Sequence, residues 1–257
     1  MPESWAFAAT FRAMRHMRRI VRLLAVSLLL PLLSSAQSAK PRSTVSVRDL
    51  SIPAQATQQF QKGVERLAKN DAAGSLPHFE RAIANFGSYY EAYFEMGMAE
   101  LKLSRAADAE QALRKSIELS AGHYAEPLFA LGAILVQQSR LAEGETILRQ
   151  ALSLDSTSWA GQYCLGWALL GLNRIDDAEK SVREALRLKP DSADSYLLLA
   201  DIHGRRHDYS AILLDLDAYL RFEPNGAMSE KVRALREKAE QQISLSEATA
   251  ALVPSEN

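Results

Sequence analysis

Residues 90–119 read YEAYFEMGMAELKLSRAADAEQALRKSIEL, with one helical pattern on either side of a short break. Apolar residues recur three and four positions apart in each half, which is the spacing of an amphipathic α-helix. Ser104 and Arg105 interrupt the pattern between the two halves. Because two helices joined by so short a connection pack antiparallel, this stretch predicts a helix–turn–helix unit.

The same unit recurs along the chain at a nearly constant step. Gly63, Gly97, Gly132 and Gly166 are separated by 34, 35 and 34 residues, and Ala200 follows after another 34. Three further columns keep this step, and their structural positions include Ala109, Ala178, Ala82, Ala151, Ala185, Pro190 and Pro224. A period of this length indicates a stacked array of helix pairs. The small residues let helices approach closely, and the prolines end second helices.

The corner between the two helices of each unit has turn chemistry. Asn70-Asp71, Ser104, Ser139, Asn173 and His207-Asp208 stand at equivalent places in successive units. Asn and Asp tolerate the left-handed and turn conformations that a sharp corner needs. These residues therefore predict the five corners of the array.

Several segments resemble the tetratricopeptide repeat (TPR) family: AYFEMG (92–97), LFALG (128–132), QYCLG (162–166), YLLLA (196–200) and AEKSVREALRLKP (178–190). The resemblance implies an all-α fold, a right-handed α–α superhelix or TPR solenoid. Its repeats would cover about residues 56–226, as 56–89, 90–123, 124–157, 158–191 and 192–226. Gly144, Ile212 and Tyr219 depart from the family's usual alanine. The last unit is therefore expected to pack differently at its outer edge.

The segments that flank the array differ from it in pattern. Residues 227–246 include SEKVRALREKAEQQI, where Val232, Leu235 and Ala239 form one apolar stripe. This predicts a capping helix over the last repeat, which a solenoid needs at its open end. Residues 37–55 are expected to form an N-terminal lead-in, and residues 247–257 a flexible tail.

The N-terminal segment has the order of a secretory signal peptide. Arginines cluster in residues 12–22, the apolar run LLAVSLLLPLL covers residues 23–33, and small residues follow. We place cleavage after Ala36, which makes residues 1–36 the signal peptide and predicts an exported protein, periplasmic or secreted. The alternative is a retained N-terminal membrane anchor, although an 11-residue run containing Pro31 is shorter than the roughly 20 residues of a spanning helix. Met14 or Met17 is an alternative start.

Charge and cysteine content exclude several classes. The formal net charge is −1, and residues 37–257 hold 25 basic and 30 acidic residues because residues 1–36 contain five arginines and one acid. Nucleic-acid binding, which needs a concentrated basic surface, is therefore not expected. Cys164 is the only cysteine, so neither an intramolecular disulfide nor a CxxC zinc site is possible.

The TPR resemblance implies that the first helix of each repeat lines a concave groove. The side chains expected there are mostly apolar: Phe60, Val64, Phe94, Met98, Leu101, Phe129, Val136, Tyr163, Trp167 and Leu170. An apolar strip of this size favours a protein or peptide partner, itself apolar. Chaperone-tail TPR domains hold a carboxylate with basic side chains at positions that are Phe60, Val64, Phe94 and Met98 here, so no such clamp is expected.

Three other interpretations of the sequence stay open. In the first, individual groove residues pack between repeats and bind nothing. In the second, the apolar strip joins copies of the protein in a homo-oligomer and binds no other ligand. The third is a metal site or enzyme using His203, Asp201 and His207. However, the segment HGRRH lacks the glutamate of HExxH, and no GxSxG, P-loop or GxGxxG occurs. We therefore expect a non-catalytic scaffold or adaptor without metal or cofactor.

Overall fold

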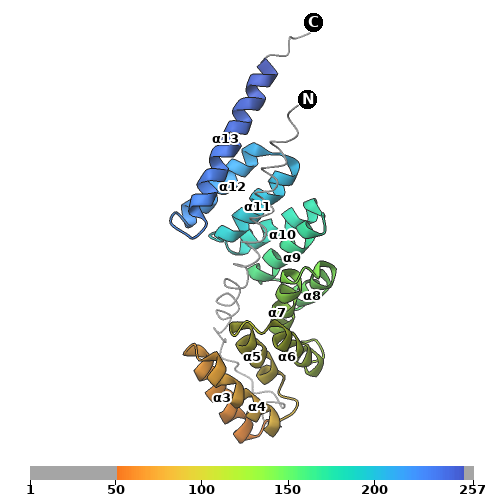
Figure 1. Ribbon diagram of the computed structural model, residues 1–257. Helices are drawn as coiled ribbons and strands as arrows, with labels where there is room; N and C mark the ends of the chain where they lie inside the picture. Colours follow the sequence, from red (N-terminus) through yellow and green to blue (C-terminus); the bar gives the residue numbers. More distant parts are fainter. Residues whose placement is uncertain (1–50, 252–257) are drawn as a thin grey trace. The chain divides into compact units, whose positions relative to one another are not determined.

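The computed structural model describes residues 51–251, with side chains to residue 246, and in this range it contains eleven α-helices and no strand (Figure 1). The fold is all-α, as predicted. The predicted signal peptide, most of the lead-in and residues 252–257 lie outside the described residues. Among the helices of the described range, none combines the length and apolar character needed to cross a membrane.

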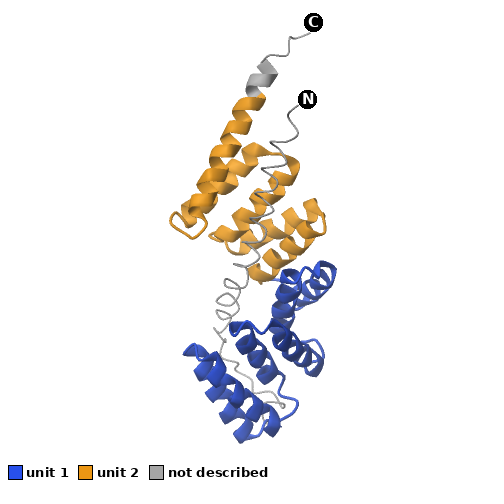
Figure 2. Ribbon diagram, viewed as in Figure 1, with its two compact units in different colours: residues 1–156 blue, residues 157–257 orange. Residues whose placement is uncertain are grey.

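The chain divides into two compact units, residues 1–156 and 157–257 (Figure 2). Unit 1 contains three helix pairs: α3 (Ala54–Ala68) with α4 (Ala72–Asn85), α5 (Tyr90–Lys102) with α6 (Ala106–Leu119), and α7 (Ala125–Gln137) with α8 (Leu141–Leu154). Unit 2 contains α9 (Trp159–Gly171) with α10 (Ile175–Leu188), and α11 (Ala193–Arg206) with α12 (Tyr209–Phe222). The last helix, α13 (Ser229–Ala251), packs on α12.

The five predicted corners have left-handed backbone conformations. Asn70, Ser104, Ser139, Asn173 and His207 have φ angles of 61°, 61°, 66°, 64° and 58°. Each residue follows a first helix and reverses the chain toward the second. Asn and His are enriched in this region among residues other than glycine, whereas the two serines are held there by the packing on either side.

The glycine column confirms the close approach of paired helices. A Cβ atom on Gly132 would lie 2.6 Å from Cγ of Leu148, and one on Gly166 would lie 2.5 Å from Cγ2 of Val182. Leu148 and Val182 are fully buried. In the first four pairs, the second helix therefore places a large side chain, Phe79, Leu113, Leu148 or Val182, in the space that glycine leaves open.

The small residues on the second helices are buried as well. Ala82, Ala109, Ala151, Ala178 and Ala185 have no exposed surface. Ser116 occupies the same column as Ala82, and its hydroxyl donates a hydrogen bond to the backbone oxygen of Tyr90 at 2.7 Å. These positions form the interfaces between successive helices, as the repeat pattern predicts.

Two second helices end where the prolines predict, whereas the last helix is longer than expected. α10 ends two residues before Pro190, and α12 ends two residues before Pro224. α13 continues to Ala251, five residues into the segment expected as a flexible tail. The sequence EATAA at 247–251 is rich in strong helix formers, which explains the extension.

Candidate partner-binding surface

The structure buries six of the ten side chains expected in the groove. These are Phe94, Met98, Phe129, Val136, Tyr163 and Leu170, each at most 7% exposed. Phe94 and Met98 belong to a cluster that also contains Phe79 and Leu113 from the second helices. The expectation of an exposed strip is therefore wrong for these six, because neighbouring helices cover them.

The other four side chains are half-buried. Phe60, Val64 and Leu101 of unit 1 pack against one core cluster while keeping part of their surface in solvent. The ring of Phe60 lies 4.9 Å from that of Tyr89, centroid to centroid. Trp167 is the half-buried groove residue of unit 2. These four residues retain surface that a partner can contact.

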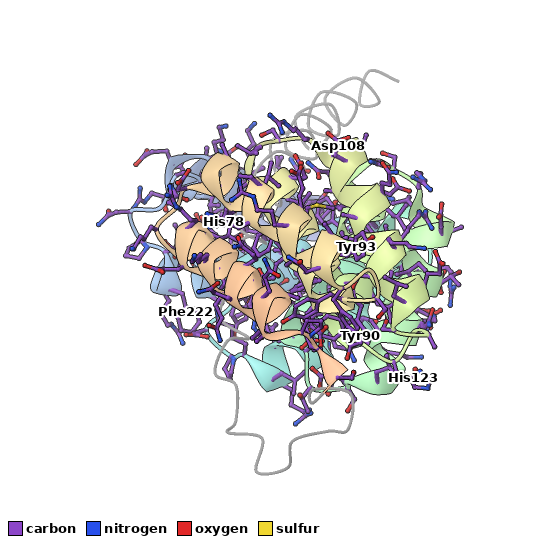
Figure 3. The ribbon with its side chains drawn as sticks, turned by 90° about the horizontal axis from the view of Figure 1, so that it is seen from below. His78, Tyr90, Tyr93, Asp108, His123 and Phe222 are labelled. Carbon is purple, nitrogen blue, oxygen red and sulfur yellow. The ribbon has the colours of Figure 1, made fainter. Side chains whose placement is uncertain are left out.

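A group of aromatic rings lies where α7 begins beside α5. Tyr124 directly precedes α7, and its ring centroid lies 5.3 Å from that of Tyr90 and 5.4 Å from that of Phe94. Figure 3 labels Tyr90, at the start of α5, and His123, which directly precedes Tyr124. Tyr90 and Tyr124 are half-buried, so the rings are partly accessible.

Three glutamates act on the hydroxyl group of Tyr124. Burial raises the pKa of Tyr124, and the negative charges of Glu126, Glu95 and Glu91 raise it further. Burial also raises the pKa of Glu95 to about 7, against the opposing charge of Lys102. Sequence reasoning missed this acidic environment. The sequence feature that could have predicted it is an acidic residue at the second position of the first helix in several repeats: Glu91, Glu126 and Asp194.

Unit 2 also combines an aromatic ring with a nearby carboxyl group, and here a lysine lies on the ring. The Nζ atom of Lys189 lies 4.4 Å from the centroid of a Trp159 ring. Asp194 is half-buried, and burial raises its pKa, with Glu223 adding to the rise and Lys189 opposing it. An ammonium group above an aromatic face and close to a carboxylate is a favourable cation–π geometry.

A buried polar network connects three helices of unit 2. Nδ1 of His203 on α11 lies 2.6 Å from Oδ2 of Asp215 on α12, and Nε2 of His203 lies 3.7 Å from Glu179 of α10. Glu179 also pairs with Arg206 and Arg183.

The pKa values of the two carboxyl groups in this network, Asp215 and Glu179, shift in opposite directions. Burial raises the pKa of Asp215 to about 6, although its hydrogen bond with His203 opposes the shift. Burial would also raise the pKa of Glu179, but the hydrogen bonds from Arg206 and Arg183 outweigh it and lower that pKa to about 2.

The structure does not bring together His203, Asp201 and His207, the residues of the alternative metal site. His203 is engaged with Asp215, Asp201 lies 3.8 Å from Arg205, and His207 forms the left-handed corner after α11. Within residues 51–246, no three His, Cys, Asp or Glu side chains form a group that could hold a metal ion. Cys164 is buried, and burial raises the pKa of its thiol to about 12, which keeps it protonated and unreactive.

Comparison with known proteins agrees with the helix-pair architecture. Two family models described as tetratricopeptide repeat match residues 60–124 and 135–202. No curated protein sequence matches the chain.

Solved TPR structures resemble the fold at low sequence identity. MamA (residues 41 to the end) from Desulfovibrio magneticus RS-1 is 16% identical, with a TM-score of 0.62, over 68% of this chain and 99% of that one. PilF of Pseudomonas aeruginosa is 17% identical, with a TM-score of 0.61, over 74% and 90%. YrrB, described as a TPR protein with an unusual peptide-binding site, is 16% identical, with a TM-score of 0.60, over 70% and 92%. The matched repeats and the helix-pair fold together identify the chain as a tetratricopeptide repeat protein.

Proposed function

We propose that this protein is an exported, non-catalytic adaptor that binds a segment of a partner protein along the first helices of its repeats. The supporting observation is the set of half-buried apolar side chains on α3 and α5, namely Phe60, Val64 and Leu101, which pack on one core cluster. Large side chains anchored at the base and open at the top make rigid contacts at low entropic cost. Trp167 is the corresponding contact of unit 2.

The fold supports a scaffold role. TPR repeats are generally non-catalytic protein-interaction modules, and the similar structure YrrB is described as having a peptide-binding site. Export rests on the basic, apolar and small-residue order of residues 12–36.

Partner capture with matched variants tests the adaptor proposal. The full-length chain is immobilised, bound proteins are identified by mass spectrometry, and the triple variant Phe60→Ala/Val64→Ala/Leu101→Ala is treated in parallel. The control, Leu76→Ala/Ile83→Ala/Ile117→Ala, truncates half-buried apolar side chains of second helices. We expect a partner retained by wild type and control to be lost by the groove variant.

The second candidate is a homo-oligomer closed by the same side chains. It predicts that the molar mass in solution, measured by light scattering, rises with concentration for wild type and stays monomeric for the groove variant. A concentration-independent monomer that captures no partner contradicts both candidates. Circular dichroism of every variant separates lost binding from lost folding.

A further inference from the structure

The connection between α12 and α13 contains an asparagine followed by glycine, Asn225-Gly226 (Figure 1). The side chain of Asn225 is exposed. An asparagine side chain can be attacked by the backbone nitrogen of the next residue, and glycine hinders this attack least because it has no Cβ atom. The reaction also needs a side-chain amide and a backbone N–H that are not held by other contacts, so the hydrogen bonds of this segment decide whether it can occur.

Neither reacting group is held in the folded chain. Within the described residues, the side chain of Asn225 makes no hydrogen bond and the backbone N–H of Gly226 donates none. The nitrogen of Gly226 can therefore reach the amide carbon of Asn225 without breaking a hydrogen bond.

The other asparagines of the described residues, Asn70, Asn85 and Asn173, have a different environment. The backbone N–H that follows each of them donates to a backbone oxygen at 3.0, 3.0 and 2.9 Å: Asp71 to Arg66, Phe86 to Ala82 and Arg174 to Leu169. The residue that follows is also larger than glycine in each case. These three asparagines are therefore matched controls within the same chain.

We propose that Asn225 deamidates spontaneously, so that the connection between α12 and α13 acquires aspartate or isoaspartate as the protein ages. The nitrogen of Gly226 forms a bond to Cγ of Asn225, the bond from Cγ to the amide nitrogen breaks, and ammonia leaves with the proton lost by Gly226. Water then opens the resulting succinimide ring. Attack of water at Cγ gives aspartate, and attack at the backbone carbonyl carbon gives isoaspartate, in which the chain runs through Cβ and Cγ. Water is the only co-reactant.

The same connection anchors the capping helix. The hydroxyl of Ser229 donates to the backbone oxygen of Glu223 at 2.5 Å, and Nη2 of Arg233 donates to that of Pro224 at 2.5 Å. Both hydrogen bonds join α13 to residues that precede Asn225. Isoaspartate inserts one methylene group into the backbone between the two ends of these bonds, and either product adds a negative charge two residues from Glu223. We expect the modified form to hold the first turns of α13 less tightly.

Peptide mapping of the full-length chain tests the modification. The purified protein is kept at 37 °C and neutral pH for several days, digested with trypsin and analysed by mass spectrometry against a digest made at the start. Trypsin places Asn225 in the peptide 222–231 and the three control asparagines in other peptides. We expect 222–231 to gain the mass difference between an acid and an amide, at a rate close to that of the same segment as a synthetic peptide, while the controls stay amides.

Two outcomes of the mapping would overturn the proposal. One is a folded chain that keeps Asn225 as an amide while the synthetic peptide deamidates, since the fold would then protect the site. The other is aspartate without isoaspartate, detected with an isoaspartyl methyltransferase, since the reaction would then bypass the succinimide.

Variants at the site separate the chemistry from the folding. Gly226→Ala keeps the amide, and its Cβ would lie 3.0 Å from Oε2 of Glu223, the end of a flexible side chain, without a left-handed backbone conformation. It should slow the deamidation several-fold, because the added Cβ hinders the attacking nitrogen. An unchanged rate in Gly226→Ala, folded by circular dichroism, would contradict attack by this nitrogen.

Asn225→Gln is the control for the capping helix, because a glutamine would have to form a larger and slower-forming ring. Amide hydrogen exchange in residues 229–243 should become faster in the aged wild type than in the fresh protein and stay unchanged in the aged variant. Equal exchange in both aged proteins would overturn the effect on α13. The comparison with the synthetic peptide keeps the modification testable if Gly226→Ala does not fold.

Discussion

At the residue scale, glycine sets the distance between paired helices. Gly132→Ala would place a Cβ atom 2.6 Å from Cγ of Leu148, a fully buried side chain that would have to shift. We expect the free energy of unfolding to fall by about 1–3 kcal/mol, the usual cost of overpacking. Gly87→Ala is the control, because no atom lies within 4 Å of its added Cβ. Urea unfolding measures both, and an equal loss in the two variants would refute the packing argument.

A second residue-scale prediction concerns the pH dependence of stability at Asp215. Burial raises its pKa to about 6 in the folded protein, above about 3.9 in the unfolded chain. The folded state therefore binds the proton more tightly. The contribution of Asp215 to the free energy of unfolding is fully present below about pH 4 and is lost as the pH rises through 6. The free energy of unfolding then falls by at most about 1.4 kcal/mol per pH unit.

The variant Asp215→Asn removes this titration. Between pH 6 and pH 4, we expect the wild-type free energy of unfolding to rise relative to that of the variant in urea titrations. Asp217→Asn is the control on the same helix, since Asp217 is half-exposed and paired with Arg236. Parallel pH profiles of wild type and Asp215→Asn would show that the carboxyl is not perturbed.

At the element scale, the pairing of α11 with α12 differs from that of α7 with α8. Leu135 of α7 and Leu169 of α9 occupy the position of His203 and are 0% and 1% exposed. Ile147 of α8 occupies the position of Asp215. Where α7–α8 has two apolar side chains of one cluster, α11–α12 therefore has a buried hydrogen-bonded pair.

This difference predicts a strong coupling between the two positions. His203→Leu alone leaves Asp215 buried without its partner and should cost about 3–5 kcal/mol. His203→Leu/Asp215→Ile copies the α7–α8 contact and should be close to wild type or more stable. A double-mutant cycle by chemical unfolding measures the coupling, and additive losses in the two single variants would argue against a specific pair.

At the scale of the whole molecule, the prediction is export. If residues 1–36 form a cleaved signal peptide, the N-terminus of the protein recovered from outside the cytoplasm should be Gln37. Edman sequencing or mass spectrometry of the purified protein reads it directly. Recovery of the intact N-terminus in the membrane fraction would favour the anchored alternative, and intact protein in the cytoplasm would contradict both.

The repeat step from Gly63 to Ala200 was sufficient to predict helix pairs, their corners and the buried small columns. These features depend on interactions between residues close in the chain, which spacing records directly. The tertiary structure decided which apolar side chains stay accessible: Phe94 and Met98 are buried while Phe60 and Leu101 keep exposed surface. Burial depends on the shape of the neighbouring helices, which the period does not encode.

The polar contacts were decided in the same way by the tertiary structure. His203 meets Asp215 twelve residues away, and Tyr124 meets Tyr90 across two helices. The sequence by itself determined that the protein is a helical repeat with a chemically distinct N-terminus. The partners of its histidine, aromatic and acidic side chains required the folded chain, because each pair comes from different helices whose approach is set by packing.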